Sequence, residues 1–373
     1  MRGLSCVAAL AGLAAAWKKG QYPRFEKEMK YYKYKWEDHK VTTEDGYELT
    51  VFRITGHKKK TFKPDKPPVL IMDGQGGDAA SWLESQAWND MDKPFQLMLA
   101  DSGYDVWLGS NRGTEYCQTH TTLDAEADYE YWDWSFAEMG MYDDPALIKY
   151  VVDNNDDFDK AFYIGYSQGT TQILWSLAYL EDDFHQHYLY KVLLMATCFD
   201  TPYDFDAQRY VDVFSQFDDY DIVALNGPEW EYDEWIIENE FDENAHDYAS
   251  GFETTGDSVM TDAHWIQNNI AGRFQHFIYD FGPDNMESEL VPVETISTVP
   301  ITNFIGTFDR VCPVETQMPY LNSMSTEVTN HWFHGKGHGH FASHNSESYM
   351  KLIECELQIP GTRRFGCWGG NYK

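Results

Sequence analysis

The sequence predicts an α/β protein built around a mostly parallel sheet. Short apolar runs of strand length recur along the chain, at 68–72, 104–108, 161–164, 192–195 and 301–305. Because nearly every position in these runs is apolar, they are typical of strands that are buried on both faces. Two segments with apolar residues at helical spacing, 144–152 and 170–180, lie between them. Alternating strands and helices indicate βαβ units, with helices flanking the sheet.

An antiparallel hairpin precedes the parallel strands. Residues 40–52 alternate apolar and polar side chains on both sides of Asp45-Gly46. Asp-Gly between two alternating segments is a strong hairpin signal, since both residues tolerate the positive φ angles of a tight turn. We therefore expect an antiparallel entry into the sheet.

Length and charge restrict the classes of function. The 373 residues allow one large domain or a core with an insertion, and the 43% of hydrophobic residues argue for a packed core. Because 61 acidic residues outnumber 28 basic ones, the net charge of −33 excludes a nucleic-acid partner and opposes adsorption to anionic lipid. Lys58-Lys59-Lys60 is interpreted as an exposed loop between two strands, with a docking patch as the alternative.

The alternation of strands and helices stops between residues 203 and 297. This segment holds 23 acidic and two basic residues, and the strand pattern resumes at Val299. An insertion of this kind above a parallel sheet is typical of a cap. We therefore expect a core formed by 17–202 and 298–373, with an acidic cap or lid at 203–297.

The N-terminus predicts export from the cytoplasm. Arg2 precedes an apolar run over residues 4–13, and the following alanines offer small residues for cleavage, so residues 1–16 have the layout of a signal peptide. The run is shorter than the roughly 20 apolar residues that a spanning helix needs. No other stretch is long and apolar enough to span a bilayer, so we expect no transmembrane segment. The predicted location is outside the cell or in a lumen such as the lysosome or a digestive vacuole.

Cysteine usage agrees with an oxidising compartment. Loss of Cys6 with the signal peptide leaves five cysteines, which permit up to two disulfides and one free thiol. Cys355 and Cys367 are close in sequence and are the expected pair. No two cysteines have the CxxC spacing of a zinc or redox site.

A nucleophile motif follows the third of the predicted parallel strands. Gly165-Tyr166-Ser167-Gln168-Gly169 comes directly after a strand and opens a helical segment. In this context Gly-x-Ser-x-Gly is a nucleophile elbow, a strained turn that lifts the serine hydroxyl out of the sheet. Larger side chains would clash in so crowded a turn, which is why it carries glycines. Ser167 is the predicted nucleophile.

Two later residues complete a catalytic triad. A serine needs a base to remove its proton, and the base needs an acid to orient it. With a nucleophile elbow, the chain order is serine, acid, histidine. Asp309 follows the strand 301–305, and His338 lies in a loop before a helix-like segment at 346–357. Ser167, Asp309 and His338 therefore have the required order.

Stretches along most of the chain resemble the acid lipases, the family that contains gastric lipase and lysosomal acid lipase. They run from about Val41 to the end, more sparsely in the cap, and are 41–47, 99–109, 112–113, 134–139, 142–146, 165–171, 264–267 and 272–275. The resemblance implies an α/β-hydrolase fold and a lipase that cleaves triacylglycerol or sterol ester at a lipid interface. We expect neither a cofactor nor a metal ion.

The resemblance also implies a role for each site residue. Ser167 is similar to the family's nucleophile, His338 to its general base and acid, and Asp309 to the acid that orients the histidine. The oxyanion hole is implied to use the backbone N–H groups of Gln168, directly after the nucleophile, and of Gln75, in the loop after the first parallel strand. Such donors typically contribute roughly 3–4 kcal/mol each to transition-state stabilisation.

One residue of the oxyanion loop departs from the family. Acid lipases usually have His-Gly at the start of this loop, where this chain has Asp73-Gly74. Because the donors are backbone groups, the hole itself is retained. An ionised carboxylate near the oxyanion would nevertheless oppose the developing negative charge. The two compatible arrangements are that Asp73 points away or that it is protonated in an acidic lumen.

Three groups of residues have alternative interpretations. Four histidines cluster near the end of the chain: His334, His338, His340 and His344. One interpretation is a metal cluster. In the other, His334 and His344 have structural or surface roles, and His340 supports the triad. In the cap, Trp230, Trp235 and Trp265 line an acyl groove or pack the cap core. The acidic residues within 229–234 form a solvated face or a calcium site, although they lack a calcium-binding loop pattern.

Three alternative functions remain beside the lipase. They are a short-chain carboxylesterase, an acyltransferase that uses the same acyl-enzyme, and a non-catalytic hydrolase-like binding protein. The intact set of Ser167, Asp309 and His338 argues against the last, whereas the sequence does not separate hydrolysis from acyl transfer.

Overall fold

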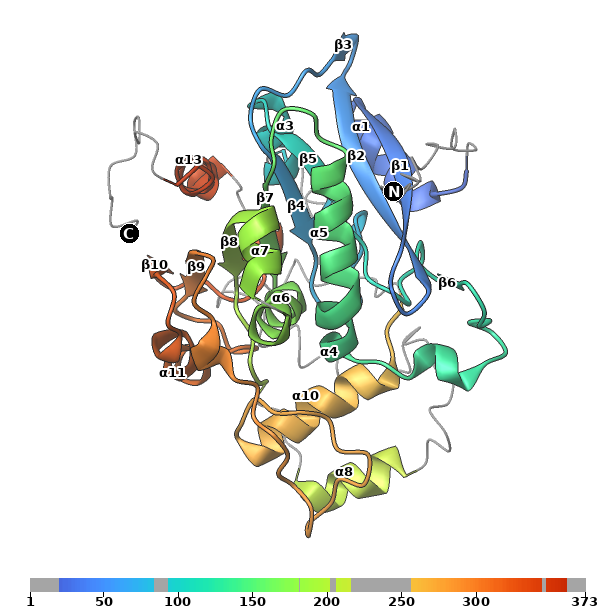
Figure 1. Cartoon of the computed structure of the whole chain (residues 1–373), viewed down its shortest axis with the longest axis vertical. Coiled ribbons are helices and arrows are strands. Elements are labelled where there is room, and N and C mark those ends of the chain that lie inside the picture. The colour runs from blue at the N-terminus through green and yellow to red at the C-terminus, as the bar shows by residue number, and fades with distance from the viewer. Residues whose placement is uncertain are drawn as a thin grey trace, which may run out of the picture.

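The described chain folds around one mixed sheet with helices on both faces (Figure 1). The computed structural model describes residues 20–83, 93–180, 182–201, 206–215, 256–343 and 347–360. The predicted signal peptide, Trp230, Trp235, the acidic residues of 229–234, His344 and Cys367 lie outside these residues.

The sheet confirms the predicted hairpin and the five predicted parallel strands. Its strands are β1 (Tyr34–Thr42), β2 (Tyr47–His57), β3 (Lys60–Thr61), β4 (Pro68–Met72), β5 (Asp105–Leu108), β6 (Thr119–His120), β7 (Ala161–Tyr166), β8 (Leu189–Met195), β9 (Ile301–Gly306) and β10 (Val328–Phe333). The main order is β1-β2-β5-β4-β7-β8-β9-β10, and β3 and β6 pair with β2. β2 pairs antiparallel with both β1 and β5. The neighbouring strands in the order β5-β4-β7-β8-β9-β10 all pair parallel.

β10 has no counterpart among the predicted strands. It lies at the edge of the sheet, and most of its side chains are only half-buried. An edge strand of this kind mixes polar and apolar residues, so its sequence lacks the continuous apolar run of the central strands.

The helices that flank the sheet include both predicted ones. The described helices are α1 (Pro23–Tyr32), α3 (Phe95–Asp101), α4 (Phe136–Glu138), α5 (Asp144–Asp153), α6 (Gln168–Tyr179), α7 (Asp182–Tyr188), α8 (Ala207–Phe214), α10 (Val259–Ala271), α11 (Val314–Ser323), α12 (His340–Ser343) and α13 (Glu347–Glu356). α5 carries a proline in its first turn, where a missing N–H costs no helical hydrogen bond. Among these described helices, none combines the length and the apolar character needed to cross a bilayer.

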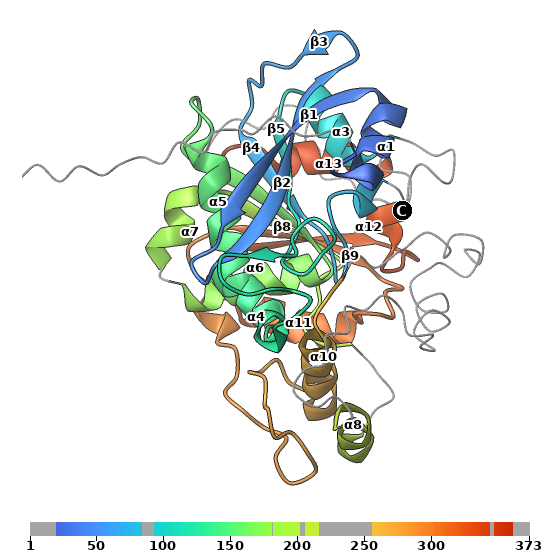
Figure 2. The same cartoon turned by 90° about the vertical axis from the view of Figure 1, so that its right-hand side faces the viewer.

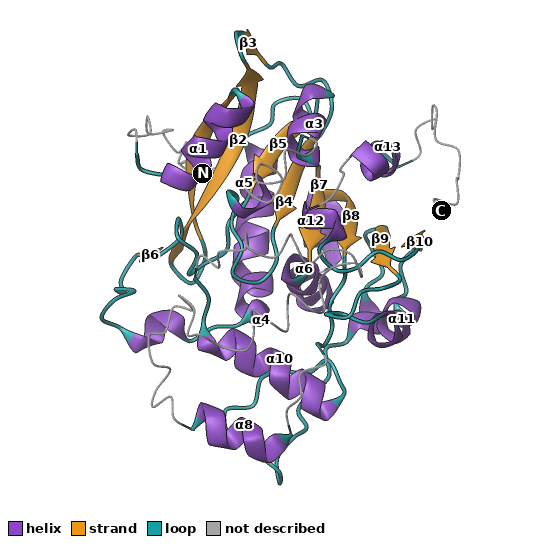
Figure 3. Ribbon diagram, turned by 180° about the vertical axis from the view of Figure 1, so that it is seen from behind, coloured by secondary structure: helices purple, strands orange, loops and turns teal. Residues whose placement is uncertain are grey.

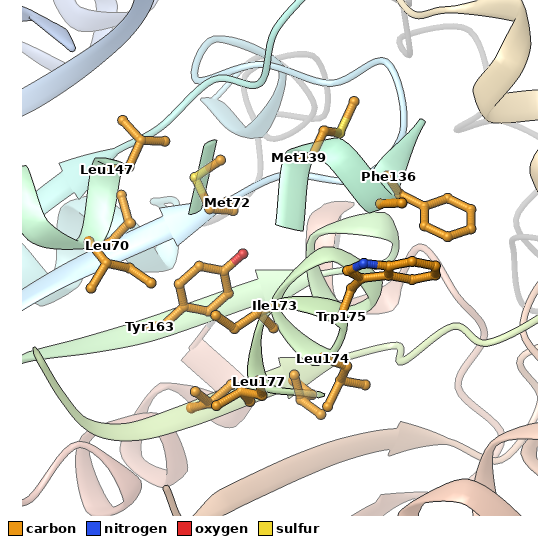
Figure 4. Packing of buried hydrophobic residues seen from close by; sticks show 14 of the residues in the cluster. Leu70, Met72, Phe136, Met139, Leu147, Tyr163, Ile173, Leu174, Trp175 and Leu177 are labelled. Atoms are coloured by element: carbon orange, nitrogen blue, oxygen red, sulfur yellow. The ribbon is translucent and has the colours of Figure 1, made fainter. Parts of the chain in front are cut away.

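The core is divided by the sheet into two apolar layers. In β4, Leu70 and Met72 face the layer formed with α5 and α6, whereas Val69 and Ile71 face the layer formed with α1, α3 and α13. Figure 4 shows the first layer, in which side chains of α4 and α6 extend the packing beyond the strand ends. Burial on both faces explains why the strand sequences read as uninterrupted apolar runs.

Two described helices of the inserted segment lie beyond the carboxyl ends of the parallel strands. α8 and α10 come between β8 and β9 in the chain, and both lie at the lower end of the molecule in Figures 1 and 2. They share a small apolar cluster with the loop that follows α10, made of Ala207, Tyr210, Ala263, Ile266, Ile278 and Phe281. From behind, Figure 3 shows α10 between α8 and the sheet. α10 and the segment that follows it both meet the core, since Trp265, Phe274, Val291 and Val293 belong to the main apolar cluster.

Candidate active site

Ser167 lies in a strained turn between β7 and α6. Its backbone has φ 49° and ψ −121°, a conformation that L-residues rarely adopt. The flanking glycines are sterically required, because a Cβ on Gly165 would lie 2.3 Å from the carbonyl oxygen of Gly169, and a Cβ on Gly169 would lie 2.6 Å from that of Asp73. This geometry is that of a nucleophile elbow.

The three predicted triad residues meet in one hydrogen-bonded chain. His338 Nε2 lies 2.8 Å from Ser167 Oγ, and His338 Nδ1 lies 2.8 Å from Asp309 Oδ2. His338 and Asp309 are both buried, so water competes little for these bonds. The loops after β9 and β10 bring the acid and the histidine to the elbow, since neighbouring parallel strands end at the same edge of the sheet.

A disulfide that the sequence did not predict adjoins the triad. Cys198, after β8, is bonded to Cys312, after β9, across a sequence separation of 114 residues. Cys198 Sγ lies 3.9 Å from Ser167 Oγ, and the backbone N–H of Cys312 donates to Asp309 Oδ1 at 2.8 Å. The disulfide therefore joins two loops that both contact the triad.

The remaining described cysteines fit the predicted count. Cys117 is free and buried, and burial raises its thiol pKa to about 11. Cys355 takes part in a disulfide, and its predicted partner, residue 367, lies outside the described residues.

The loop after β4 places Gln75 beside the elbow. Gly74 packs so closely against the nucleophile that a Cβ there would lie 3.0 Å from Ser167 Cβ. Within the described residues, the backbone N–H groups of Gln75 and Gln168 donate to no protein atom. Two unpaired N–H groups next to a nucleophile are what a substrate oxyanion requires.

Asp73 is buried and is stabilised in its neutral form. Its Oδ1 accepts the N–H of Gly74 at 2.7 Å, and its carboxyl group lies against Gly77, where a Cβ would come within 2.7 Å of Asp73 Cγ. Burial raises the pKa of this carboxyl well above its usual value. This raised pKa agrees with the protonated form, one of the two arrangements that the sequence left open.

Two further histidines of the predicted group, His334 and His340, lie within the described residues and have surface or packing positions. His334 is exposed, and His340 is buried against the rings of Phe333 and Tyr349. In the described ranges, the residues that could meet around a metal ion are Cys198, Cys312 and His338, and the two sulfur atoms are already bonded to each other.

Trp265 of α10 contacts the elbow directly. It is buried, packs on the Phe136 ring at a centroid distance of 4.6 Å, and donates from Nε1 to Gln168 Oε1 at 3.0 Å. Trp265 therefore packs into the main apolar cluster of the sheet rather than into the cap cluster, which differs from both sequence interpretations, and it adds a polar contact to the elbow.

Comparison with known proteins agrees with this geometry. A family model described as a partial alpha/beta-hydrolase lipase region matches residues 25–86. Human lysosomal acid lipase/cholesteryl ester hydrolase is 38% identical over 136 residues, which are 36% of this chain and 33% of that protein. Bovine gastric triacylglycerol lipase is 29% identical over 276 residues, covering 66% of this chain and 67% of that one. Over these stretches the chain is similar to gastric and lysosomal acid lipases.

Further lipases match over shorter stretches. Mouse lipase member M is 35% identical over 158 residues, which are 42% of this chain and 36% of that protein. The matches to mouse lipase member M and to human lysosomal acid lipase each span about a third of that relative's length.

Solved structures show the same fold at low sequence identity. An esterase from Thermogutta terrifontis aligns with a TM-score of 0.52 and 14% identity over 86% of this chain and 97% of that one. Carboxylesterase CesB from Bacillus subtilis aligns with a TM-score of 0.55 and 11% identity, over 90% and 96%. Together with the parallel sheet, these alignments show an α/β-hydrolase fold.

Proposed function

We propose that this chain is a lipase of the acid lipase family, a serine hydrolase that cleaves carboxylic esters of lipids, either triacylglycerol or sterol ester. The observation that carries the proposal is the unbroken hydrogen-bonded chain from Asp309 through His338 to Ser167. Its similarity to gastric triacylglycerol lipase and to lysosomal acid lipase/cholesteryl ester hydrolase supports lipid esters as the substrate class.

The first half of the reaction forms an acyl-enzyme. His338 Nε2 takes the proton of Ser167 Oγ as that oxygen attacks the ester carbonyl, and Asp309 holds the ring and stabilises the resulting imidazolium. The backbone N–H groups of Gln75 and Gln168 receive the tetrahedral oxyanion. When the intermediate collapses, His338 gives the proton to the departing alcohol, and the acyl group remains on Ser167.

The second half repeats these steps with water. His338 removes a proton from a water molecule, whose oxygen attacks the acyl carbonyl, and the second oxyanion occupies the same two N–H groups. Its collapse breaks the bond to Ser167, which recovers its proton from His338, and the carboxylic acid leaves.

The proposal includes the organisation and location of the whole chain. Residues 1–16 act as a signal peptide, 17–202 and 298–373 form the hydrolase core, and 203–297 form an acidic cap that restricts access of acyl chains. The enzyme works outside the cell or in a lumen, at a lipid ester interface and without nucleic acid or cofactor. The Cys198–Cys312 disulfide supports an oxidising compartment.

Replacing the nucleophile tests the reaction. Ser167→Ala and the unmodified chain are compared on short soluble and emulsified long-chain esters at about pH 5 and about pH 7.5. Loss of activity by about 10⁴-fold or more is expected, since the base has no hydroxyl to activate. Ser323→Ala, at the exposed end of α11, is the matched control and keeps full activity.

The same assay separates the alternatives. Activity confined to short esters would replace the lipase with a short-chain carboxylesterase. New esters formed with an added alcohol, in preference to free acid, would indicate an acyltransferase. An unmodified chain that is as inactive as Ser167→Ala would contradict catalysis and favour a hydrolase-like binding protein.

A further inference from the structure

One face of α10 contacts both residues of the proposed oxyanion hole. Gln75 Nε2 donates to Asp262 Oδ1 at 2.5 Å, and Trp265 Nε1 donates to Gln168 Oε1 at 3.0 Å. Asp262 and Trp265 are three residues apart, so they lie on the same side of the helix. A single turn of the inserted segment therefore contacts the side chains of both residues that are proposed to form the oxyanion hole.

The two contacts hold residues in different local structures, Gln168 at the start of α6 and Gln75 in the loop after β4. Gln168 begins α6, its side-chain nitrogen also contacts Met139 Sδ at 3.5 Å, and its N–H direction is fixed by the elbow. Gln75 instead lies between Gly74 and Gly76-Gly77, whose backbones have the largest conformational freedom of any residue type. Within this loop the N–H of Gly77 donates to the carbonyl of Gly74 at 3.2 Å, and the side chain of Gln75 adds the bond to Asp262 that joins the loop to α10.

An oxyanion hole is sensitive to small displacements. Its donors act because they are already oriented toward the developing charge, and a shift of about 1 Å can cost about 100-fold in rate. A glycine-rich loop that is free to move loses part of this advantage, even when the triad is intact. The contact from Asp262 opposes that movement.

The charge of Asp262 also matters for the loop. Gln75 and Asp257 face this carboxyl, from the core loop and from the residue two before α10. Burial raises the pKa of Asp262 to about 7 and that of Asp257, which also faces the charge of Asp262, to about 8. At acidic pH both acids are neutral and Asp262 accepts the bond as a carbonyl oxygen. Above neutral pH a carboxylate would lie beside the loop and oppose an oxyanion.

We propose that Asp262 is a positioning residue for the reaction: through Gln75 it holds the loop that supplies one oxyanion N–H, which makes the inserted helix α10 part of the active site. The proposal rests on the proposed function, because an oxyanion hole has this role only in acyl transfer. Trp265 has the same role for Gln168, with a smaller effect, since the elbow already fixes that N–H.

The test compares Asp262→Ala, Asp262→Asn and Trp265→Phe in the full chain. The readouts are kcat and KM on a soluble nitrophenyl ester between about pH 5 and about pH 8, together with the rate of Ser167 labelling by a fluorophosphonate. D262A is expected to lower kcat and the labelling rate by about 10-fold to 100-fold with little change in KM. W265F is expected to lower them by about 2-fold to 3-fold.

Asp262→Asn separates positioning from mere stability. Asparagine keeps an oxygen acceptor but never carries a charge, so D262N should retain kcat within about 3-fold at about pH 5. It should also retain a larger fraction of that kcat at about pH 8 than the unmodified chain. Gln267→Ala is the matched control, because Gln267 also lies on α10 but binds Tyr210 Oη and the carbonyl of Ile278 within the insertion.

The outcomes distinguish this proposal from the one on which it rests. Unchanged kcat and pH profile in D262A, or equal losses in D262A and Q267A, would overturn the positioning role and leave the hydrolase intact. An unmodified chain with neither activity nor labelling would overturn the proposed function and the positioning role together. Thermal melts of each variant show whether a loss follows from unfolding.

Discussion

The two sides of Ser167 are held in place by different means. On the proton-transfer side, Asp309 and His338 come from loops of the core, and a disulfide joins the Asp309 loop to the segment after β8. On the oxyanion side, Gln75 lies in a glycine-rich loop whose side-chain anchor comes from the inserted helix α10. One side is joined by a disulfide within the core, and the other combines hydrogen bonds within its own loop with a hydrogen bond to the insertion.

This difference indicates which side of Ser167 would change its geometry if the insertion moved. Movement of α10 would change the oxyanion side first, because among the described residues no disulfide restrains the loop of Gln75. The proton-transfer side would keep its geometry. In the proposed mechanism, α10 would thereby couple the proposed cap to transition-state stabilisation as well as to substrate access.

The largest expected effect is a loss of kcat on substitution of Asp309, on the proton-transfer side. Asp309→Asn keeps an acceptor for the N–H of Cys312 but turns the carboxylate facing His338 Nδ1 into a neutral amide. The histidine then loses its stabilising charge and its preferred tautomer, so we expect kcat to fall by about 10³-fold to 10⁴-fold. Steady-state kinetics and a thermal melt measure the effect. A loss below about 10-fold would show that Asp309 does not orient the base.

A smaller effect should follow from removing the disulfide. Cys198→Ala/Cys312→Ala frees two loops that the disulfide joins across 114 residues. We expect the free energy of unfolding to fall by about 2–4 kcal/mol, since the unfolded chain gains freedom, and kcat to fall by about 10-fold as Asp309 and Ser167 lose their shared support. Urea unfolding and kinetics measure both.

Cys117→Ala is the matched control for the disulfide variant. This residue is also a buried cysteine, but its thiol is free and contacts β2 rather than the triad. If the double variant changes stability without changing kcat, the disulfide supports the fold alone.

The smallest expected effect is a pH dependence of stability on the oxyanion side. The pKa values of Asp257 and Asp262, about 8 and about 7, lie above the ordinary value of 3.8. Their contribution to stability is therefore fully present below about pH 4 and is lost as the pH rises to about 8. Asp257→Asn/Asp262→Asn should gain about 2–4 °C in melting temperature relative to the unmodified chain between about pH 5 and about pH 8.

The comparison must be made against the unmodified chain at each pH. Burial lowers the pKa of His185 to about 4 and that of His264 to about 3, so these histidines destabilise the fold as the pH falls below about 6.5. Both chains contain them, so their effect cancels in the difference. A melting difference that does not grow with pH would contradict the assigned titration of the two acids.

Local patterns in the sequence were sufficient for most of the fold and for the triad. Five parallel strands, the hairpin at Asp45-Gly46 and the helices α5 and α6 follow from periodicity and turn residues within short windows. The positions of Ser167, Asp309 and His338 follow from a motif and from the order of residues after strand ends. These features are local, and the parallel sheet brings the strand ends together without further information.

Only the tertiary structure decided how the site is supported. The Cys198–Cys312 bond and the contact of Gln75 with Asp262 join residues separated by 114 and 187 positions. Neither has a local signature, because a pairing of this kind depends on how the insertion packs on the core. The state of Asp73 was also open, since a carboxyl group is neutral or charged according to its burial, and burial is a property of the folded chain. The sequence alone therefore determined the chemistry of the site, and the folded chain determined its environment.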